Sequence, residues 1–397
     1  MVKLPHNRYR DGLLLAACHA IVRFQERVAL NKPASKIALA LSCSMRVVYS
    51  VLAPTFLYFL PINWNLIRSN ALTENIPAPN HGLRYLLLGI WERFDTLWYL
   101  HIARYGYDRS DSVVFYPLYP ALVRIFSFVL DPTAGALLIS TVAAFFLFWG
   151  LQRVLGDVPH ATVTRVLILS AVWPSSFIFF AGYPESLLLA LIVWSLDLAK
   201  KESWLASAAL ALAAEMTKAV GAIVAVPLLV MAIRRRSAST WPAFLTPFGA
   251  LIFPGWVRWS GYGTIDSAYR QYWHTSPALP WTTLFSAGAK LLHGHSPILF
   301  LNAIFLIAFC IFVGVAKTRL EYQAYATTAI VVCLCKQTDP PLQSMMRYLI
   351  IVFPGFLGLA QLLQNSRWKS KFGLVVLALF VVNAAWMWLF LGWSLVL

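Results

Sequence analysis

Long apolar runs separated by short polar turns dominate the chain from residue 37 onward. They lie at 37–60, 134–152, 163–181, 184–199, 203–216, 219–233, 240–258, 297–316, 321–336, 345–363 and 372–393. Continuous apolar runs of this kind are typical of membrane-crossing helices, which need about 20 residues. The pattern therefore predicts an all-α polytopic membrane protein with about 11 transmembrane helices, of which the shorter ones are tilted or partly buried.

Composition supports this interpretation. Only 12% of the 397 residues are charged, against about 25% in soluble domains, and 59% are hydrophobic. In residues 1–36, the apolar stretch 12–22 is too short to cross a membrane and is flanked by charge. It predicts an amphipathic surface helix without a cleavable signal. Residues 37–397 then form a single transmembrane domain.

The net charge of +16 could suggest a nucleic-acid partner, but the distribution of the Lys and Arg residues along the chain argues against one. The same distribution predicts the orientation of the chain in the membrane. If the N-terminus is cytoplasmic, the inside segments, together with Arg165 at the mouth of its span, carry 19 of the 32 Lys and Arg residues, an enrichment that is typical of cytoplasmic segments. This count requires that residues 115–130, which contain two early prolines and Arg124, do not cross the membrane. Residues 61–133 are therefore expected to form a long first external loop that carries interfacial helices.

Four charged residues fall at the outer face of this topology. Asp95 lies among aromatic residues of "WERFDTLWYLHIARYGY", Glu185 follows a proline at the start of an apolar run, and Lys218 and Arg347 lie at outer turns. Each is individually compatible with a solvated or structural helix-end charge. Because charges near the bilayer are costly without a partner or a function, their common side favours a reaction on an anionic lipid headgroup.

Four sequence blocks carry a family resemblance. The first is Arg93-Phe94-Asp95 with the following "IARYGY" and "FYPLYP", and the second is "WPSSFIFFAGYPESLLLAL" with Tyr183 and Glu185. The third is "ALAAEMTKAVG" and the fourth "MMRYLIIVFPGFLGLA". In this order the chain resembles the PIG-V family, which comprises GPI mannosyltransferase II and bacterial relatives within the GT-C superfamily of membrane glycosyltransferases. Trp98 stands where eukaryotic members tend to have histidine.

The resemblance implies a GT-C fold and transfer of mannose or a related hexose from a polyprenyl-phosphate sugar to an acceptor hydroxyl, with inversion. It places the catalytic base at Asp95, a role that suits a carboxylate. Lys218 and Arg347 are candidate ligands of the donor phosphate, with Arg93 less favoured. The candidate substrate-binding residues are Glu185, Tyr183, Tyr348, Trp98, Tyr119 and His274.

No metal or other cofactor is expected. The external segments contain no D-x-D motif, "DRSD" at 108–111 is interpreted as a turn, and the five cysteines lack ligand spacing. The expected partners are the bilayer, a polyprenyl-phosphate hexose and a glycolipid, glycan or protein acceptor. The resemblance to bacterial members implies an inner-membrane location with an extracytoplasmic active site. A lipid-linked sugar transporter or flippase, and a non-catalytic subunit that binds lipid-linked sugar, remain alternatives.

Overall fold

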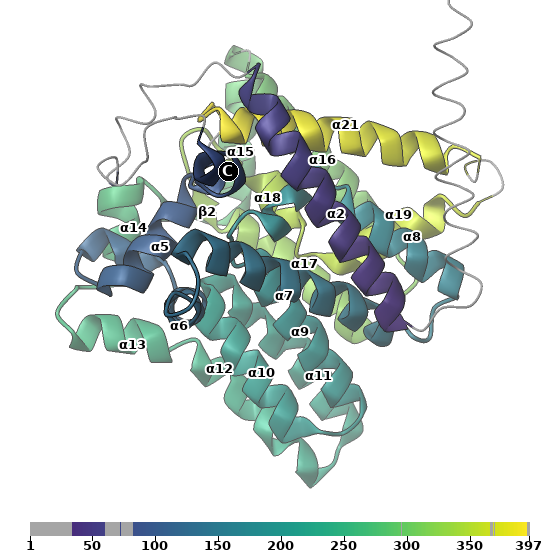
Figure 1. The fold of residues 1–397 in the computed structure, drawn as a ribbon. Helices are drawn as coiled ribbons and strands as arrows, with labels where there is room; N and C mark the ends of the chain where they lie inside the picture. The colour runs from purple at the N-terminus through teal and green to yellow at the C-terminus, as the bar shows by residue number, and fades with distance from the viewer. Residues whose placement is uncertain are drawn as a thin grey trace, which may run out of the picture.

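The computed structural model describes residues 34–59, 72, 82–294, 296–365, 368 and 370–394, most of them helical (Figure 1). The predicted amphipathic segment at 1–36 lies almost entirely outside these residues. Within them, four helices are long and apolar enough to cross a membrane: α2 (Ala34–Leu57), α7 (Pro132–Val154), α16 (Pro297–Val315) and α21 (Phe372–Leu391). The protein is thus an all-α membrane protein, while a total of 11 crossings remains a prediction.

Shorter helices pack beside these four and against one another. They are α8 (His160–Ala171), α9 (Glu185–Lys200), α10 (Trp204–Thr217), α11 (Ala225–Arg235), α17 (Leu320–Leu334) and α19 (Phe353–Leu362). Helix α9 packs against both α7 and α10, and α11 packs against α17. Serine hydroxyls link this group: Ser186 donates to the Ser140 carbonyl at 2.9 Å, and Ser195 to the Ser207 carbonyl at 2.8 Å. Small polar residues at close helix contacts are typical of membrane bundles.

Four predicted spans are interrupted rather than continuous. In the predicted span 163–181, η4 (Ser176–Phe180) follows α8, and in the span 219–233, η5 (Ala219–Val224) precedes α11. The span 240–258 is divided into η6 (Ala238–Leu245), α12 (Thr246–Gly249) and α13 (Ile252–Trp259). In the span 345–363, α18 (Met345–Leu349) precedes α19. Prolines explain much of this, because proline lacks an N–H donor and restricts the residue before it. Pro174 follows α8, and Pro247 and Pro354 occupy first turns, where proline is tolerated.

The segment before α7 consists of short elements. They are α4 (Leu83–Leu87), η2 (Gly89–Trp91), α5 (Asp95–Tyr105), η3 (Ser110–Val114) and α6 (Leu118–Phe126). With nine residues, α6 is about 14 Å long at 1.5 Å per residue, roughly half the thickness of a hydrocarbon core. It is too short to cross the membrane on its own, which agrees with the prediction for residues 115–130.

A second group of short elements follows α13. Helices α14 (Ile265–Trp273) and α15 (Pro280–His293) flank the two-residue strand β1 (Ser276–Pro277), which pairs antiparallel with β2 (Lys336–Gln337). Ser276 lies opposite Gln337, and Pro277 opposite Lys336. This short ladder ties the end of α14 to the end of α17 and thereby fixes the position of Lys336.

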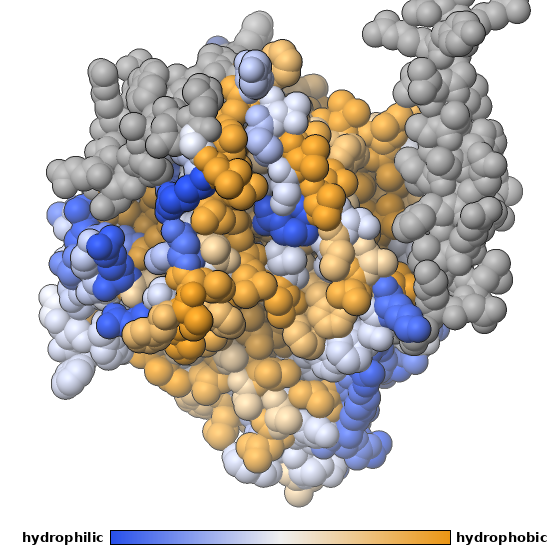
Figure 2. Space-filling view, viewed as in Figure 1, coloured by the Kyte–Doolittle hydropathy of each residue, from blue (hydrophilic) through white to orange (hydrophobic). Residues whose placement is uncertain are grey.

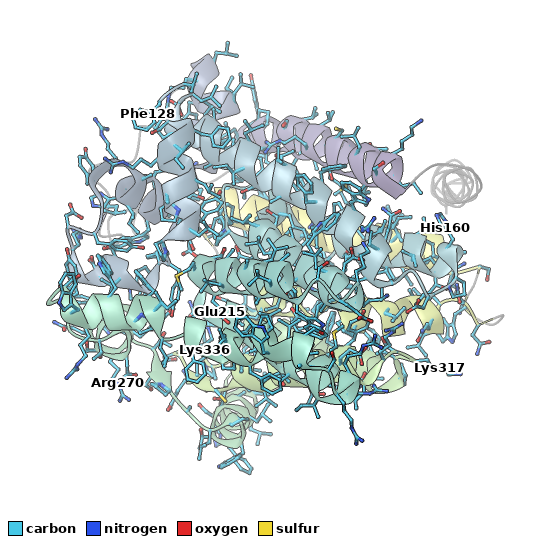
Figure 3. The ribbon with its side chains drawn as sticks, turned by 90° about the horizontal axis from the view of Figure 1, so that it is seen from below. Phe128, His160, Glu215, Arg270, Lys317 and Lys336 are labelled. Carbon is cyan, nitrogen blue, oxygen red and sulfur yellow. The ribbon has the colours of Figure 1, made fainter. Side chains whose placement is uncertain are left out.

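The molecule has two polar ends separated by an apolar surface. In Figure 2 hydrophilic residues gather at the left, over α5 and α14, and at the lower right beyond α11, with hydrophobic residues between them. From below, Figure 3 places Arg270 at one end and His160 and Lys317 at the other. The chain therefore has the polarity of a membrane protein with two distinct faces.

Glycines bring α16 and α19 into close contact. A Cβ added at Gly358 would lie 1.8 Å from the Phe312 carbonyl oxygen, and one at Gly355 would lie 2.2 Å from the Phe309 ring. Backbone atoms cannot move aside as a flexible side chain can. In contrast, a Cβ at Gly314 on the same helix α16 would have no neighbour within 4 Å.

We predict that Gly358→Ala lowers the free energy of unfolding by about 1–3 kcal/mol, because overpacking forces α16 and α19 apart. Gly314→Ala is the matched control, and it should be neutral or stabilising by up to about 1 kcal/mol through helix propensity. Thermal unfolding of the purified chain in detergent measures both. Equal losses in the two variants would contradict the proposed helix contact.

Candidate active site

Four segments distant in sequence meet at one end of the helices. Asp95 is the first residue of α5, Glu185 is the first residue of α9, Lys218 directly follows α10, and Arg347 lies in α18. Asp95, Lys218 and Arg347 line a cavity of about 370 Å³. This volume lies within the range of about 300–1,000 Å³ that is usual for small-molecule sites.

A continuous chain of ion pairs connects these four residues. Arg347 Nη2 lies 2.6 Å from Asp95 Oδ2, Arg347 Nε lies 2.6 Å from Glu185 Oε1, and Lys218 Nζ lies 2.7 Å from the same Glu185 oxygen. The Glu185 and Arg347 side chains are only 2% and 4% exposed, whereas that of Asp95 is 20% exposed. The Glu185–Arg347 pair is therefore buried, and the Asp95 carboxylate is the more exposed end of this chain.

The backbone before Asp95 is held in an unusual conformation. Phe94 has φ of 47°, in the left-handed region that bulky residues rarely adopt. Its ring packs against Phe390 and Trp393, with centroids 5.4 and 4.6 Å away. Strain of this kind clusters at functional sites and persists only where packing compensates for it. Here the aromatic packing fixes the point at which α5 begins.

Tyr183 is a positioning residue rather than part of the cavity wall. Its hydroxyl accepts a hydrogen bond of 3.2 Å from the Asp95 backbone N–H, and its ring lies under the Arg347 guanidinium at 4.6 Å. It is fully buried. Tyr183 therefore orients both partners of the Asp95–Arg347 pair without reaching the cavity.

Lys336 is a site residue that the sequence analysis missed. It lines the cavity from β2, donates to the Tyr348 hydroxyl at 2.8 Å, and lies 4.1 Å from the centre of that ring. Among the described residues it has no carboxylate partner within ion-pair distance. The signal was present in the sequence: Lys336 ends the apolar run 321–336, on the same predicted side as Lys218 and Arg347.

The charges of the site do not balance. Lys218, Lys336 and Arg347 are three cations, whereas Asp95 and Glu185 are the two carboxylates bonded to them. Asp266 also lines the cavity, but it pairs with Arg270 of the same helix at 2.9 Å. Among the described residues, the cluster therefore carries an excess of one positive charge and is suited to an anion.

Aromatic side chains form a large part of the wall. The predicted substrate-binding residue Tyr348 lines the cavity, together with Tyr99, Phe115, Tyr269 and Trp273. Burial raises the pKa of Tyr99 and of Tyr269 above the usual tyrosine range, and the Asp95 carboxylate adds to both shifts. Both hydroxyls therefore stay protonated at neutral pH and are able to donate hydrogen bonds to a bound ligand.

The remaining predicted site residues lie farther from the cavity. Trp98 stacks behind Phe115 at 5.5 Å, and Tyr119 is buried with its hydroxyl 2.8 Å from Ser140 Oγ. His274 is exposed and ends α14 in a left-handed conformation. Since none of the three lines the cavity, Trp98 and Tyr119 support its wall, and direct contact with a substrate remains a prediction.

Arg93 has a structural environment. Its guanidinium is buried and donates to the carbonyl oxygens of Leu391 (2.9 Å) and Gly89 (3.0 Å) and to the Tyr85 hydroxyl (3.0 Å). It therefore ties the segment before α5 to the end of α21. Arg93 does not line the cavity. Its contacts hold the backbone next to Asp95 in place.

The predicted turn at 108–111 has local partners. Asp108 lies 2.8 Å from His101 Nε2, and Asp111 pairs with Arg109 at 2.6 Å. In the described part of the chain, no three His, Cys, Asp or Glu residues are grouped so as to hold a metal ion. Independence of a metal stays a prediction that requires a chelator experiment.

We predict that Arg347→Met destabilises the fold strongly. Breaking a buried ion pair costs about 3–5 kcal/mol, and the lower end applies here because Lys218 stays on Glu185. Thermal unfolding in detergent tests this, with Arg270→Met as the control that breaks an exposed pair worth about 0.3–0.5 kcal/mol. Equal losses for Arg270→Met and Arg347→Met would contradict the structural role of the buried pair.

Comparison with known proteins does not identify the chain. No protein-family model matches it, and no curated protein is significantly similar to it. The chemistry of the cavity, together with the sequence resemblance, is therefore what supports a proposal of function.

Proposed function

We propose that the chain is a membrane glycosyltransferase of the GT-C type, related to the PIG-V family. It transfers mannose or a related hexose from a polyprenyl-phosphate sugar to an acceptor hydroxyl on the extracytoplasmic face of a bacterial inner membrane. One observation supports this most: the Asp95 carboxylate opens into the same cavity as a cluster with excess positive charge. A base and an anion site side by side are what this transfer requires.

Asp95 is the proposed catalytic base. Its Oδ2 accepts from Arg347, and its Oδ1 has no hydrogen-bond partner among the described residues. In the reaction the acceptor oxygen attacks the anomeric carbon, the bond from that carbon to the phosphate oxygen breaks, and the acceptor proton passes to Asp95. A single displacement of this kind inverts the anomeric centre, so a β-linked donor yields an α-linked product.

Lys218, Lys336 and Arg347 are the proposed phosphate ligands. A polyprenyl-phosphate sugar is a phosphodiester with one negative charge, which matches the excess charge of the cluster. When the sugar leaves, the phosphate monoester gains further negative charge. The cations therefore interact more strongly with the transition state than with the bound donor, and this difference accelerates the reaction.

We predict that Asp95→Asn abolishes transfer, with a loss of at least about 10²-fold as for other general bases, while donor binding persists. The assay uses purified protein in detergent, polyprenyl-phosphate mannose and a panel of acceptors, with donor binding measured separately. Activity should survive a chelator, and Asp266→Asn, a cavity residue paired with Arg270, should keep most of it.

Three results would count against this mechanism. They are unchanged turnover in Asp95→Asn, retention of anomeric configuration, and loss of activity with the chelator. Tight donor binding without turnover on any acceptor would favour a binding subunit. Movement of intact donor across vesicles without transfer would favour a flippase.

We predict that Lys336→Met raises the donor KM by at least about tenfold, because a charge-assisted contact to phosphate contributes about 1.5–3 kcal/mol. Lys290→Met is the matched control: Lys290 is exposed, pairs with Asp339 and lies outside the cavity lining. Steady-state kinetics over donor concentration measures both variants. An unchanged KM in Lys336→Met would place the phosphate elsewhere.

A further inference from the structure

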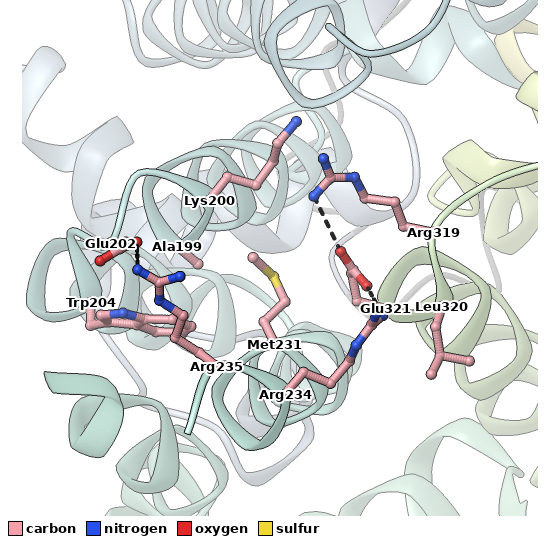
Figure 4. Close-up of a pocket in the computed structure, with 10 residues that line it drawn as sticks. All are labelled: Ala199, Lys200, Glu202, Trp204, Met231, Arg234, Arg235, Arg319, Leu320 and Glu321. Carbon is pink, nitrogen blue, oxygen red and sulfur yellow. Dashed lines mark hydrogen bonds and ion pairs between the residues drawn. The ribbon is translucent and has the colours of Figure 1, made fainter. Parts of the chain in front are cut away.

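A second charged cavity lies at the opposite end of the same helices. Its volume is about 600 Å³, and it is enclosed by the ends of α9 and α11 and the beginnings of α10 and α17 (Figure 4). The proposed active site uses the other ends, with Glu185 at the start of α9, Lys218 after α10 and Lys336 after α17. The two sites are thus separated by the length of these helices, and this inference does not depend on the proposed function.

Four cations and two carboxylates line this basic cavity: Lys200, Arg234, Arg235, Arg319, Glu202 and Glu321. Arg235 pairs with Glu202, and Arg234 and Arg319 share Glu321 at 3.4 and 3.6 Å. Arg319 and Lys200 also pair with Asp157, outside the lining, at 2.5 and 3.3 Å. The three arginine side chains are between 45% and 61% exposed. The Arg235–Glu202 pair is about half exposed on both sides, and exposed pairs contribute about 0–1 kcal/mol, so Arg235 can exchange its carboxylate for a ligand at little cost. Glu321 is only 7% exposed, so Arg234 and Arg319 stay paired with it and offer their remaining N–H groups to a ligand.

A buried donor points to the same kind of ligand. Trp204 lines the cavity and is only 4% exposed, and its indole N–H has no acceptor in the described part of the chain. Trp204 also begins α10, whose first-turn N–H groups favour an anion. An unsatisfied buried N–H costs about 1–3 kcal/mol, and an oxyanion within the cavity would remove that cost.

The lining is also partly apolar, which favours a lipid over a soluble anion. Ala199, Met231 and Leu320 contribute to it, and Leu320 is 59% exposed. Figure 4 shows Met231 between the Arg235–Glu202 and Arg234–Glu321 pairs. The Arg234–Arg236 triplet marks this end as the predicted cytoplasmic side, where anionic lipids concentrate and interhelical basic pockets bind their headgroups.

We propose that the basic cavity binds the phosphate headgroup of an anionic phospholipid from the cytoplasmic leaflet. Arg234, Arg235 and Arg319 contact the phosphate oxygens, Trp204 donates its indole N–H, and the acyl chains leave past Met231 and Leu320. Such a lipid would bridge α9, α10, α11 and α17. It would thereby stabilise the four-helix arrangement that also carries Glu185, Lys218 and Lys336.

The test measures phosphatidylglycerol binding to the full chain in a neutral detergent, by native mass spectrometry and by the shift of the thermal unfolding midpoint. We expect saturable binding of phosphatidylglycerol with at least tenfold preference over phosphatidylcholine. Arg235→Gln should weaken it roughly tenfold, and Trp204→Phe, which keeps the ring but removes the N–H, by roughly three- to tenfold. Arg236→Gln is the matched control, because Arg236 is exposed and does not line the cavity.

Three outcomes would overturn the proposal. Equal loss in Arg236→Gln and Arg235→Gln would show diffuse attraction by surface charge. An equal midpoint shift with inorganic phosphate would show an anion site without lipid specificity. Undiminished phosphatidylglycerol binding in both Arg235→Gln and Trp204→Phe would place the lipid elsewhere. Trp204→Phe keeps the experiment decisive if Arg235→Gln fails to fold.

Discussion

The carboxylate of Glu185 is buried at the start of α9, and the cations that it requires decide how the surrounding segments are placed. A carboxylate removed from water costs several kcal/mol unless opposite charges compensate. Lys218 supplies one cation, and Arg347 supplies a second that also reaches Asp95. Because three segments converge on one buried charge, none of these helix ends can shift without exposing an uncompensated ion.

Irregular backbone makes this convergence possible. Lys218 has extended dihedrals where α10 gives way to η5, and a Cβ at Gly221 would lie 2.2 Å from the Ala214 carbonyl oxygen. Ser344 and Phe94, which precede α18 and α5, have φ of 64° and 47°. In an uninterrupted helix the direction of each side chain is set by the regular turn of the helix. The breaks release Lys218, Arg347 and Asp95 from this regular pattern, so that their side chains meet. Left-handed residues cost of order 1–3 kcal/mol each, which the buried ion pairs and aromatic packing offset.

The sequence predicted the helical membrane character and the common location of Asp95, Glu185, Lys218 and Arg347, because hydropathy and charge sidedness are visible along a chain. Hydropathy did not predict the interruptions, since the mean hydropathy of an apolar run is the same whether or not the helix is broken at its centre. The prolines that explain much of the interruption are visible in the sequence, but proline also occurs in the first turn of continuous helices. Lys336 was missed because its importance depends on the short β1–β2 ladder. Arg46, a charged residue within α2, donates to the Phe180 carbonyl at 2.7 Å and lies over Trp91, contacts that hydropathy does not encode.

The two ends of α9, α10 and α17 differ in how deeply their ion pairs are buried. At one end the pairs are buried, so they are expensive to break and fix geometry, as a reacting site needs. At the other end the arginines are about half exposed, and the exposed Arg235–Glu202 pair is readily exchanged. A ligand at the exposed end can therefore be gained or lost without unfolding the bundle. The same helices carry both sites. A ligand that holds the exposed ends of these helices together therefore also restricts the movement of the opposite ends, which carry the buried ions.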